Sequence, residues 1–488
     1  MTGTDYVFKI NALEINQKDD TLYKERSLKP TNKNEAFSSS IQDKNHNFIK
    51  YLAPRDLTKD LIVCGTNLGK PHIYDLKESD LSNQLEYNGD YLCAGAENQN
   101  SLNLIDFQNG ISKFGLMYSG IWLHERLSQT YGIFSRYGVF RKEIEINRHF
   151  ARTLFSPHWL WEPEFVSITQ DNKYIFYFFT EISIEHFSFT HSRFNLASLI
   201  NLSNLTLNSN LVRNARVARV CKNDRGVKDS TLNGMWTTFR KIRLECSCNK
   251  DSNQNRSSFE IPAFSINFNN LKIMKTHANK LFGIFHERLP NILNGDSNIF
   301  SVICEYDFDL MRKNLETKNF WLIRANDAEN DLEEDFDCEN TDETLDDSAY
   351  TAKVNENLKF LSENTILDSS LVGECKLILS HRVTALTIET INENESLFYL
   401  GTFDGQLIRV FKNDSVYSTL SLMDLNNSSN LTCSRTENRN IIEILINEKN
   451  LYISTPDCLY QLSPTEVVCN GYMSCLDCNS GKEKAQNY

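Results

Sequence analysis

The sequence lacks the short patterns that mark the commonest enzyme sites. It contains no GxSxG, no HExxH and no glycine-rich phosphate-binding loop, which speaks against serine-hydrolase, zinc-protease and P-loop chemistry. Its histidines do not fall at metal-ligand spacing: His72, His124, His149, His158, His186 and His191. We therefore expect a protein that is not an enzyme and uses no metal or cofactor.

Positive charge and long apolar runs are also scarce. The chain has 51 Lys and Arg against 64 Asp and Glu, a net charge of −13. Such an acidic chain lacks the phosphate-neutralising surface that nucleic-acid binding needs. No apolar run approaches the roughly 20 residues that span a bilayer. The first 15 residues hold no apolar segment of the kind found in secretory signal peptides.

About a dozen acidic residues gather between Asp327 and Asp347. A calcium loop would need oxygen ligands at fixed positions around a glycine, and this run has no such spacing. We interpret it as a solvated surface loop.

Two features indicate an oxidising compartment. The chain has 13 cysteines and no doubled C-x-x-C spacing of a zinc site, so disulfide bonds are favoured. It also carries eight Asn-x-Ser/Thr sequons, the acceptor pattern for N-linked glycans: Asn201, Asn204, Asn255, Asn394, Asn413, Asn426, Asn427 and Asn430.

The stretch from Arg216 to Ser247 reads as two strands joined by a polar loop. In the second, Ile242, Leu244 and Cys246 alternate with charged residues, as in a strand with one wet face. Such a unit cannot bury its apolar face alone, so it must belong to a larger β assembly.

Six further segments repeat this strand-turn-strand form: 61–76, 115–134, 173–189, 281–307, 397–411 and 451–462. Seven such units predict an all-β fold, a seven-bladed β-propeller with four-stranded blades. Their irregular spacing argues against a WD-repeat protein. Residues 358–372 read as a short helix.

The amino-acid sequence of residues 216–247 resembles part of the semaphorin domain. Members of that family carry R-V-C-K-x-D-x-G-G followed by W-T-T-F-x-K-x-R-L-x-C-S. Here the first run departs only at Val227, where the family has its second glycine. Cys64 to Pro71 resembles the family's C-G-T-N-x-x-x-P run, and Arg152 to Val166 resembles another. The cysteine pattern is similar to that of secreted invertebrate class 2 semaphorins.

This resemblance implies the disulfide bond Cys246–Cys304, and Cys338 is the nearest positional match to the family's partner of Cys221. The family's partner for Cys64 is replaced by Ile73 here, so Cys93, in the next polar stretch, is the nearest candidate for a Cys64–Cys93 bond. Cys248 has no counterpart partner, and we weigh an inter-chain bond against a buried thiol.

Both ends look incomplete against the family. The strand expected before Asp5 is missing, and Cys469, Cys475 and Cys478 resemble the first half of a small disulfide-bonded plexin–semaphorin–integrin module. We expect the propeller over 1–466 and a truncated module over 467–488. Half a module should not fold, so this tail should be disordered.

Basic residues are frequent around the hairpin: Arg213, Arg216, Arg219, Lys222, Arg225, Lys228, Arg240, Lys241 and Arg243. One interpretation is solvated strand faces with local ion pairs. The other is a surface for a partner or a glycosaminoglycan.

The resemblance implies an extracellular ligand that binds a plexin through its propeller, acts as a homodimer and guides axons or migrating cells. Three alternatives remain: a plexin-like receptor fragment, an intracellular propeller scaffold and a propeller enzyme. The family signatures argue against the first and the missing catalytic patterns against the last. Reduced cysteines without glycans would favour the scaffold.

Overall fold

The structure is a computed structural model of the whole chain. It describes residues 2–3, 5–10, 23–30, 46–54, 60–97, 99, 101–106, 116–123, 131–137, 150–185, 212–222, 224, 226–227, 233–248, 267–290, 297–317, 320, 338, 365–425, 439–447, 450–456 and 458–462. The chain divides into two compact units. Unit 1 comprises Met1–Leu244 and Arg312–Leu371, and unit 2 comprises Glu245–Met311 and Val372–Tyr488.

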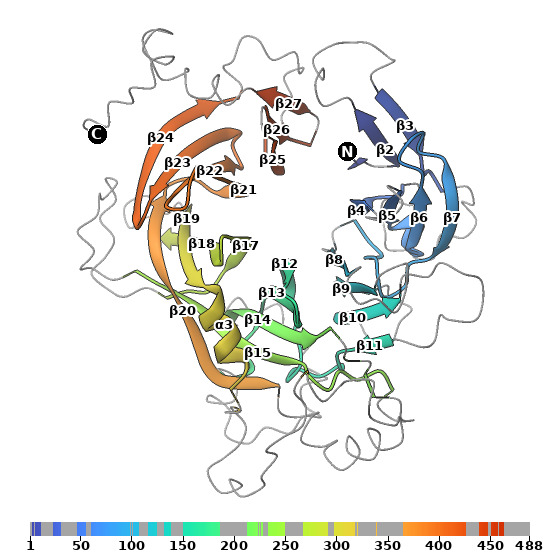
Figure 1. The fold of residues 1–488 in the computed structure, drawn as a ribbon, viewed down its shortest axis with the longest axis horizontal. Coiled ribbons are helices and arrows are strands. Elements are labelled where there is room, and N and C mark those ends of the chain that lie inside the picture. The colour runs from blue at the N-terminus through green and yellow to red at the C-terminus, as the bar shows by residue number, and fades with distance from the viewer. Residues whose placement is uncertain are drawn as a thin grey trace, which may run out of the picture. The chain divides into compact units, whose positions relative to one another are not determined.

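Antiparallel strands in sequence order build unit 1 (Figure 1). They form four consecutive groups: β1 (Thr2–Gly3), β2 (Tyr6–Ile10) and β3 (Tyr23–Ser27); β4 (Ile49–Pro54), β5 (Leu61–Gly65), β6 (His72–Leu76) and β7 (Asn83–Asn88); β8 (Ser101–Asp106), β9 (Leu116–Trp122), β10 (Tyr131–Tyr137) and β11 (Phe150–Arg152); and β12 (Glu164–Gln170), β13 (Tyr174–Ile182), β14 (Arg213–Cys221) and β15 (Arg240–Ser247). A short 3-10 turn, η3 (Asn67–Gly69), connects β5 to β6, and the end of β15 belongs to unit 2.

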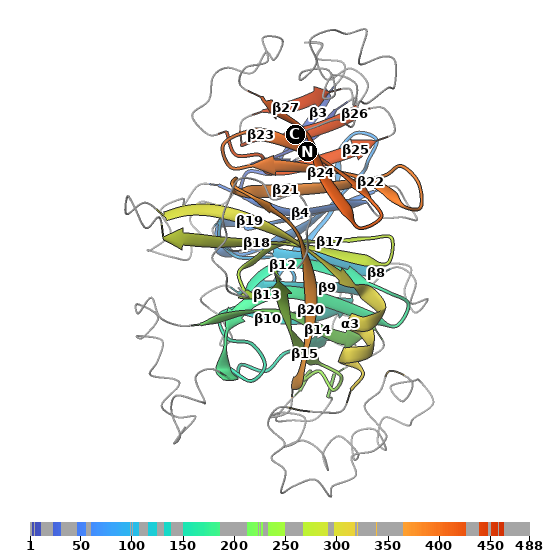
Figure 2. The same cartoon turned by 90° about the vertical axis from the view of Figure 1, so that its left-hand side faces the viewer.

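Unit 2 is built in the same way. Its strands form three further groups: β17 (Leu271–His277), β18 (Lys280–Pro290), β19 (Ser297–Asp307) and β20 (Ile366–Leu379); β21 (Val383–Thr390), β22 (Glu395–Thr402), β23 (Gln406–Asn413) and β24 (Val416–Asp424); and β25 (Glu443–Asn447), β26 (Asn450–Ser454) and β27 (Leu459–Leu462). Two-residue β16 (Asn267–Phe268) pairs with β15, and helix α3 (Phe308–Leu315) follows β19. β20 starts in unit 1 and α3 ends there. Figure 2 shows the long β18–β19 hairpin from the side.

These groups confirm the all-β class and the propeller type of fold, since they are antiparallel meanders and five of them form separate sheets of three or four strands. The burial of their apolar residues explains why sheets pack face to face. All nine residues of β13 are buried, because one face packs into a cluster with Tyr118 and Trp236 while Phe176 and Phe178 are buried on the other. Strands buried on both faces require sheets on both sides. The number of blades stays a prediction.

Six of the seven expected hairpins are present as antiparallel pairs: β5–β6, β9–β10, β14–β15, β18–β19, β22–β23 and β26–β27. The hairpin expected over 173–189 is wrong in its described part, because β13 runs from Tyr174 to Ile182 without a turn. The expected helix over 358–372 is also wrong from residue 366 onward, where β20 begins. Periodicity in a short apolar run does not separate strand from helix, and pairing with β19 decides for the strand.

None of the helices among the described residues is long and apolar enough to cross a membrane. The tail 467–488 lies outside the described residues, so its expected disorder stays a prediction.

Candidate functional site

The hairpin β14–β15 lies in the middle of a meander that includes β12 and β13. β14 pairs with β13 along its whole length, from Arg213 opposite Ile182 to Cys221 opposite Tyr174. On its other side Ala215 lies opposite Leu244 and Arg219 opposite Arg240. β14 is therefore an interior strand, and eight of its nine residues are buried.

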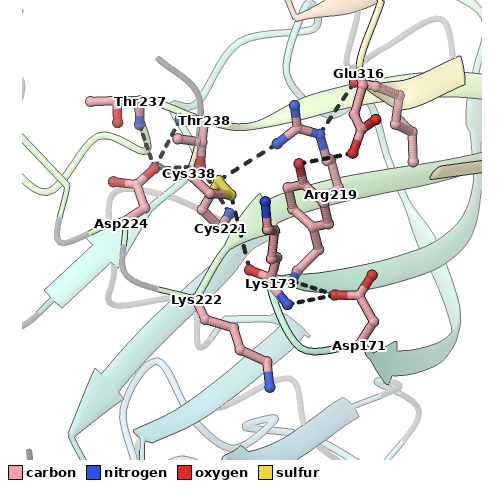
Figure 3. The surroundings of a disulfide bond; sticks show 12 residues. Asp171, Lys173, Arg219, Cys221, Lys222, Asp224, Thr237, Thr238, Glu316 and Cys338 are labelled. Carbon is pink, nitrogen blue, oxygen red and sulfur yellow. Dashed lines mark hydrogen bonds between the residues drawn. A yellow bond between two sulfur atoms is a disulfide. The ribbon is translucent and has the colours of Figure 1, made fainter. Parts of the chain in front are cut away.

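Asp224 organises the loop between these strands (Figure 3). One carboxylate oxygen accepts from the Gly226 backbone N–H at 2.9 Å. The other accepts from the backbone N–H groups of Thr237 and Thr238, at 2.9 and 2.8 Å, and from the Thr238 hydroxyl at 2.7 Å. Burial raises the pKa of Asp224, and these hydrogen bonds oppose the rise. The acid thus ties the start of the loop to its end.

Gly226 and Val227 close the same loop. Gly226 has φ +69°, and a Cβ there would lie 2.8 Å from the Gly234 carbonyl oxygen, so glycine is required. Val227 exchanges two backbone hydrogen bonds with Gly234 and Met235. Its side chain is 2% exposed and packs in the core. The residue that departs from the family pattern is therefore a core residue here.

Trp236 anchors the exit of the loop. Its indole N–H donates to the Ile133 carbonyl at 3.0 Å, and its ring stacks on Tyr118 at 6.5 Å between centroids. The Tyr118 hydroxyl donates to the Lys222 carbonyl at 2.8 Å. Trp236 thus satisfies its polar atom and joins two sheets of unit 1.

Four charged side chains form a buried cluster next to the hairpin. Arg216 donates to Glu181 at 3.0 Å and to Glu185 at 2.6 Å. Lys241 donates to the same Glu181 at 2.6 Å and to the Trp159 carbonyl at 2.7 Å. Arg216 and Lys241 are fully buried and Glu181 is 1% exposed. Two cations and two carboxylates balance, which is the condition for keeping charge inside a core.

The cluster shifts the ionisation of its members. Burial lowers the pKa of Lys241 to about 8, against the attraction of Glu181. Burial acts to raise the pKa of Glu185, but the charge and hydrogen bonds of Arg216 outweigh it and lower this pKa to about 2. In the folded chain, Glu185 therefore stays ionised until the pH falls to about 2.

This shift predicts sensitivity to acid. Because the pKa of Glu185 falls from 4.5 to about 2 on folding, it contributes stability that is complete above pH 4.5 and is lost as pH falls toward 2. The contribution at neutral pH is about 3 kcal/mol. Urea unfolding measured between pH 7 and pH 2 should show a smaller decrease for Glu185→Gln than for the wild type. An equal decrease in both proteins would contradict this role.

For four of the basic residues around the hairpin, both the solvated strand face and the partner surface are wrong, because these side chains are buried. Arg216, Arg219, Lys222 and Lys241 are at most 4% exposed. Lys222 pairs with buried Asp106 at 3.3 Å. These four side chains are buried and engaged within the fold, so they are not accessible to a glycosaminoglycan. Arg225 and Lys228 lie outside the described residues.

A disulfide bond joins Cys221, at the end of β14, to Cys338 in the acidic run (Figure 3). The Cα atoms lie 5.5 Å apart, and the bond closes a separation of 117 residues. Arg219 lies beside it, with its guanidinium 3.6 Å from the Cys221 sulfur and 4.4 Å from the centre of the Tyr174 ring. It also donates to the Leu315 carbonyl at 3.2 Å.

Three more disulfide bonds link described cysteines. Cys246 bonds to Cys304, the pairing that the resemblance implied, and Cys64 bonds to Cys93, its nearest candidate partner. The inter-chain role considered for Cys248 is wrong in this structure, because Cys248 bonds to Cys375 with Cα atoms 4.9 Å apart. That pair comes from strand contacts 127 residues apart, which no spacing in the sequence indicates. Cys458 is also disulfide-bonded.

Two of the predicted glycosylation sites lie on exposed, described residues. They are Asn394, next to the start of β22, and Asn413, at the end of β23. The other sequons lie outside the described residues, as does Cys469: Asn201, Asn204, Asn255, Asn426, Asn427 and Asn430.

The described part of the chain contains no group of three or more His, Cys, Asp or Glu side chains that could hold a metal ion. The buried hairpin provides a rigid frame, and the residues that this frame leaves exposed form surfaces that a partner could contact.

One such surface is an aromatic patch in unit 1, formed by Trp122, Tyr131 and Phe155. Phe155 is 58% exposed and its ring lies 5.9 Å from that of Tyr131, which lies 4.9 Å from Trp122. Arg213 borders the patch, since it donates to the Glu162 carbonyl at 2.7 Å and the backbone of Glu162 hydrogen-bonds Tyr131. No periodic pattern along the chain marks this patch.

Comparisons with known proteins extend over most of the chain. Semaphorin-6D of Mus musculus is 23% identical over 97% of this chain and 42% of its own length. The chain spans less than half the length of the curated relatives it matches. No protein-family model matches it.

Solved structures show the same fold. Drosophila Semaphorin 2a superposes with a TM-score of 0.70 at 20% identity, covering 94% of this chain and 70% of that one. A structure of Drosophila Plexin A in complex with Semaphorin 1b gives 0.64 at 18% identity, covering 93% and 81%.

The signature hairpin with its Asp224 loop carries the family's wording on one interior strand pair. The chain is thus similar to semaphorins in sequence over nearly its whole length and shares the fold of solved semaphorins.

Proposed function

We propose that the chain is an extracellular signalling ligand that binds a plexin. The observation that carries this proposal is the signature hairpin, which departs from the family pattern only at Val227, on a semaphorin fold; a solved complex pairs Plexin A with Semaphorin 1b. The chain acts through an interface rather than through catalysis.

An extracellular location agrees with the cysteines. Four disulfide bonds join described cysteines, and such bonds persist in oxidising compartments. This favours a secreted ligand, or the ectodomain of a membrane protein, over an intracellular scaffold. A plexin-like receptor fragment is the remaining alternative, and a structure of the Plexin A4 extracellular region matches with a TM-score of 0.58 at 13% identity.

The active form we propose is a homodimer. Two ligand copies would gather two receptors, and the receptors' proximity would carry the signal that guides axons or migrating cells. The propeller over 1–466 would form this ligand, with 467–488 as the start of a following module.

The aromatic patch is our candidate for the receptor contact. Interface hot spots are enriched in exposed aromatic residues backed by well-packed neighbours, with arginine close by. Phe155 rests on Tyr131, which is only 8% exposed, so its ring is held in place before any partner arrives. A preorganised ring loses little conformational entropy on binding.

Binding of the purified chain to a panel of plexin ectodomains, measured by surface plasmon resonance, tests the proposal. Phe155→Ala should weaken binding about tenfold, because loss of a hot-spot aromatic costs more than about 1 kcal/mol. Leu85→Ala is the matched control: Leu85 is 47% exposed in unit 1 but stands outside the patch, and its affinity should stay unchanged. Folded wild-type chain that binds no plexin would overturn the function; full affinity of Phe155→Ala would overturn only the patch.

A further inference from the structure

Strand β24 is an exposed edge of its sheet. It ends the order β21–β22–β23–β24, and no further described strand pairs with it (Figure 1). Its sequence, VYSTLSLMD, has no charge before the final Asp424. Val416 is 45% exposed and Leu422 is 52% exposed. An uncharged edge strand rich in β-forming residues is a template for pairing with another chain.

Natural edges are blunted by charge, proline, bulges or covering segments. β24 has one of these devices: Arg409 lies opposite Ser421 and Val410 opposite Thr419, which leaves Leu420 as an extra, bulged residue. The bulge interrupts the middle of the strand. It leaves the first residues, from Val416 to Thr419, in regular register and unprotected.

Two sequons meet at this unprotected end. Asn413 is the residue opposite Val416 in the register of β23 and β24. Asn394 is its neighbour, since the Asp414 backbone N–H donates to the Asn394 carbonyl at 3.0 Å. The turn between β21 and β22, which holds Asn394, also contains Ile391, whose side chain is 53% exposed.

Both asparagines are chemically available. Asn394 and Asn413 are exposed, and neither carboxamide forms a hydrogen bond with another residue of the described chain. The hydroxyls of Ser396 and Ser415, which complete the sequons, are equally without described partners. Asn392 in the same turn differs, because its carboxamide is engaged with the backbone of Asn394 and Glu395.

We propose that Asn394 and Asn413 carry N-linked glycans that cover the exposed end of β24 and prevent edge-to-edge association. In the modification, the carboxamide nitrogen bonds to the anomeric carbon of a sugar donated by a lipid pyrophosphate. The bond from that carbon to the pyrophosphate oxygen breaks, the lipid pyrophosphate leaves, and the nitrogen loses one proton. This inference rests on the extracellular route of the proposed function.

The position explains the need for both sites. A glycan on Asn413 projects beside Val416, and one on Asn394 projects from the turn that holds Ile391. Together they cover the only stretch of β24 that neither the bulge nor the terminal Asp424 protects. Bulky, hydrated glycans there leave no room for a second strand to approach.

The test expresses the whole chain behind a cleavable secretion leader in eukaryotic cells, with site occupancy read by glycopeptide mass spectrometry. We expect glycans at both asparagines. Ser396→Ala and Ser415→Ala should each abolish only their own glycan, while Ser396→Thr and Ser415→Thr, which keep the hydroxyl, should retain it. The double alanine variant should show a several-fold larger aggregated fraction in size-exclusion chromatography with light scattering. Adding Val416→Lys to that double variant should restore the monodisperse protein, because a charge replaces the lost cover.

Two further outcomes keep the inference falsifiable. Secreted wild type with both asparagines unmodified overturns the sites. If the double variant is poorly secreted, endoglycosidase treatment of folded wild type replaces it, and unchanged association after complete deglycosylation overturns the protective role. Plexin binding is measured separately: glycosylated chain that binds no plexin overturns the proposed function and leaves this inference standing.

Discussion

Replacing Arg216 with methionine is expected to lower the free energy of unfolding of unit 1 by about 3–5 kcal/mol, the typical cost of removing one partner from a buried ion pair. Arg216 is fully buried and its guanidinium holds both Glu181 and Glu185. Without it, two buried carboxylates face Lys241 alone. Domains are stable by only about 5–15 kcal/mol, so the loss is a large share of the total.

Tryptophan fluorescence during urea unfolding provides the measurement, because all five tryptophans fall within the residue ranges of unit 1. Arg243→Met is the matched control: Arg243 lies opposite Arg216 in the register but is exposed, so its loss should cost less than about 1 kcal/mol. Adding Glu185→Gln to Arg216→Met should recover part of the stability. A double variant no more stable than the single one would contradict the coupling.

Replacing Asp224 with alanine should cost about 3 kcal/mol or more, because it leaves four buried donors without an acceptor. Three are backbone N–H groups, of Gly226, Thr237 and Thr238, and the fourth is the Thr238 hydroxyl. The loop would also lose the tie that places Trp236 in the core. We expect a lower urea midpoint and lower secretion.

A graded pair of variants separates the hydrogen bonds from simple crowding. Asp224→Asn keeps one acceptor oxygen in nearly the same volume, so its stability should lie between those of wild type and Asp224→Ala. Asp80→Ala, at an exposed carboxylate that accepts from the Ser82 backbone, should have a small effect. Equal stability of Asp224→Ala and wild type would show that the loop closes without this acid.

The strands were predictable because their signal is local. Alternation along 240–247 and apolar runs along 61–76 and 397–411 report which faces a strand buries, whatever lies against them. The prediction of a helix over 358–372 was wrong from residue 366 onward for the same reason. A short apolar run fits either structure, and contact with β19 made residues 366–379 a strand.

Whether a charged side chain is buried or exposed could not be predicted in this way. Arg216 and Lys241 read as surface residues, since buried cations are rare without partners. Their partner Glu181 stands 35 and 60 positions earlier in the chain, on another strand. The pairing of β13 with β14, and of β14 with β15, brings the opposite charges together.

The β class, the family pattern of the hairpin and the sequons can be recognised in the amino-acid sequence without the structure. This is possible because these are patterns written along the chain. The tertiary structure decided that Cys248 bonds to Cys375, that four basic side chains are buried, and that Asn394 and Asn413 meet beside an open edge. Each of these depends on which distant strands lie side by side, a fact that packing and backbone pairing set and local pattern does not contain.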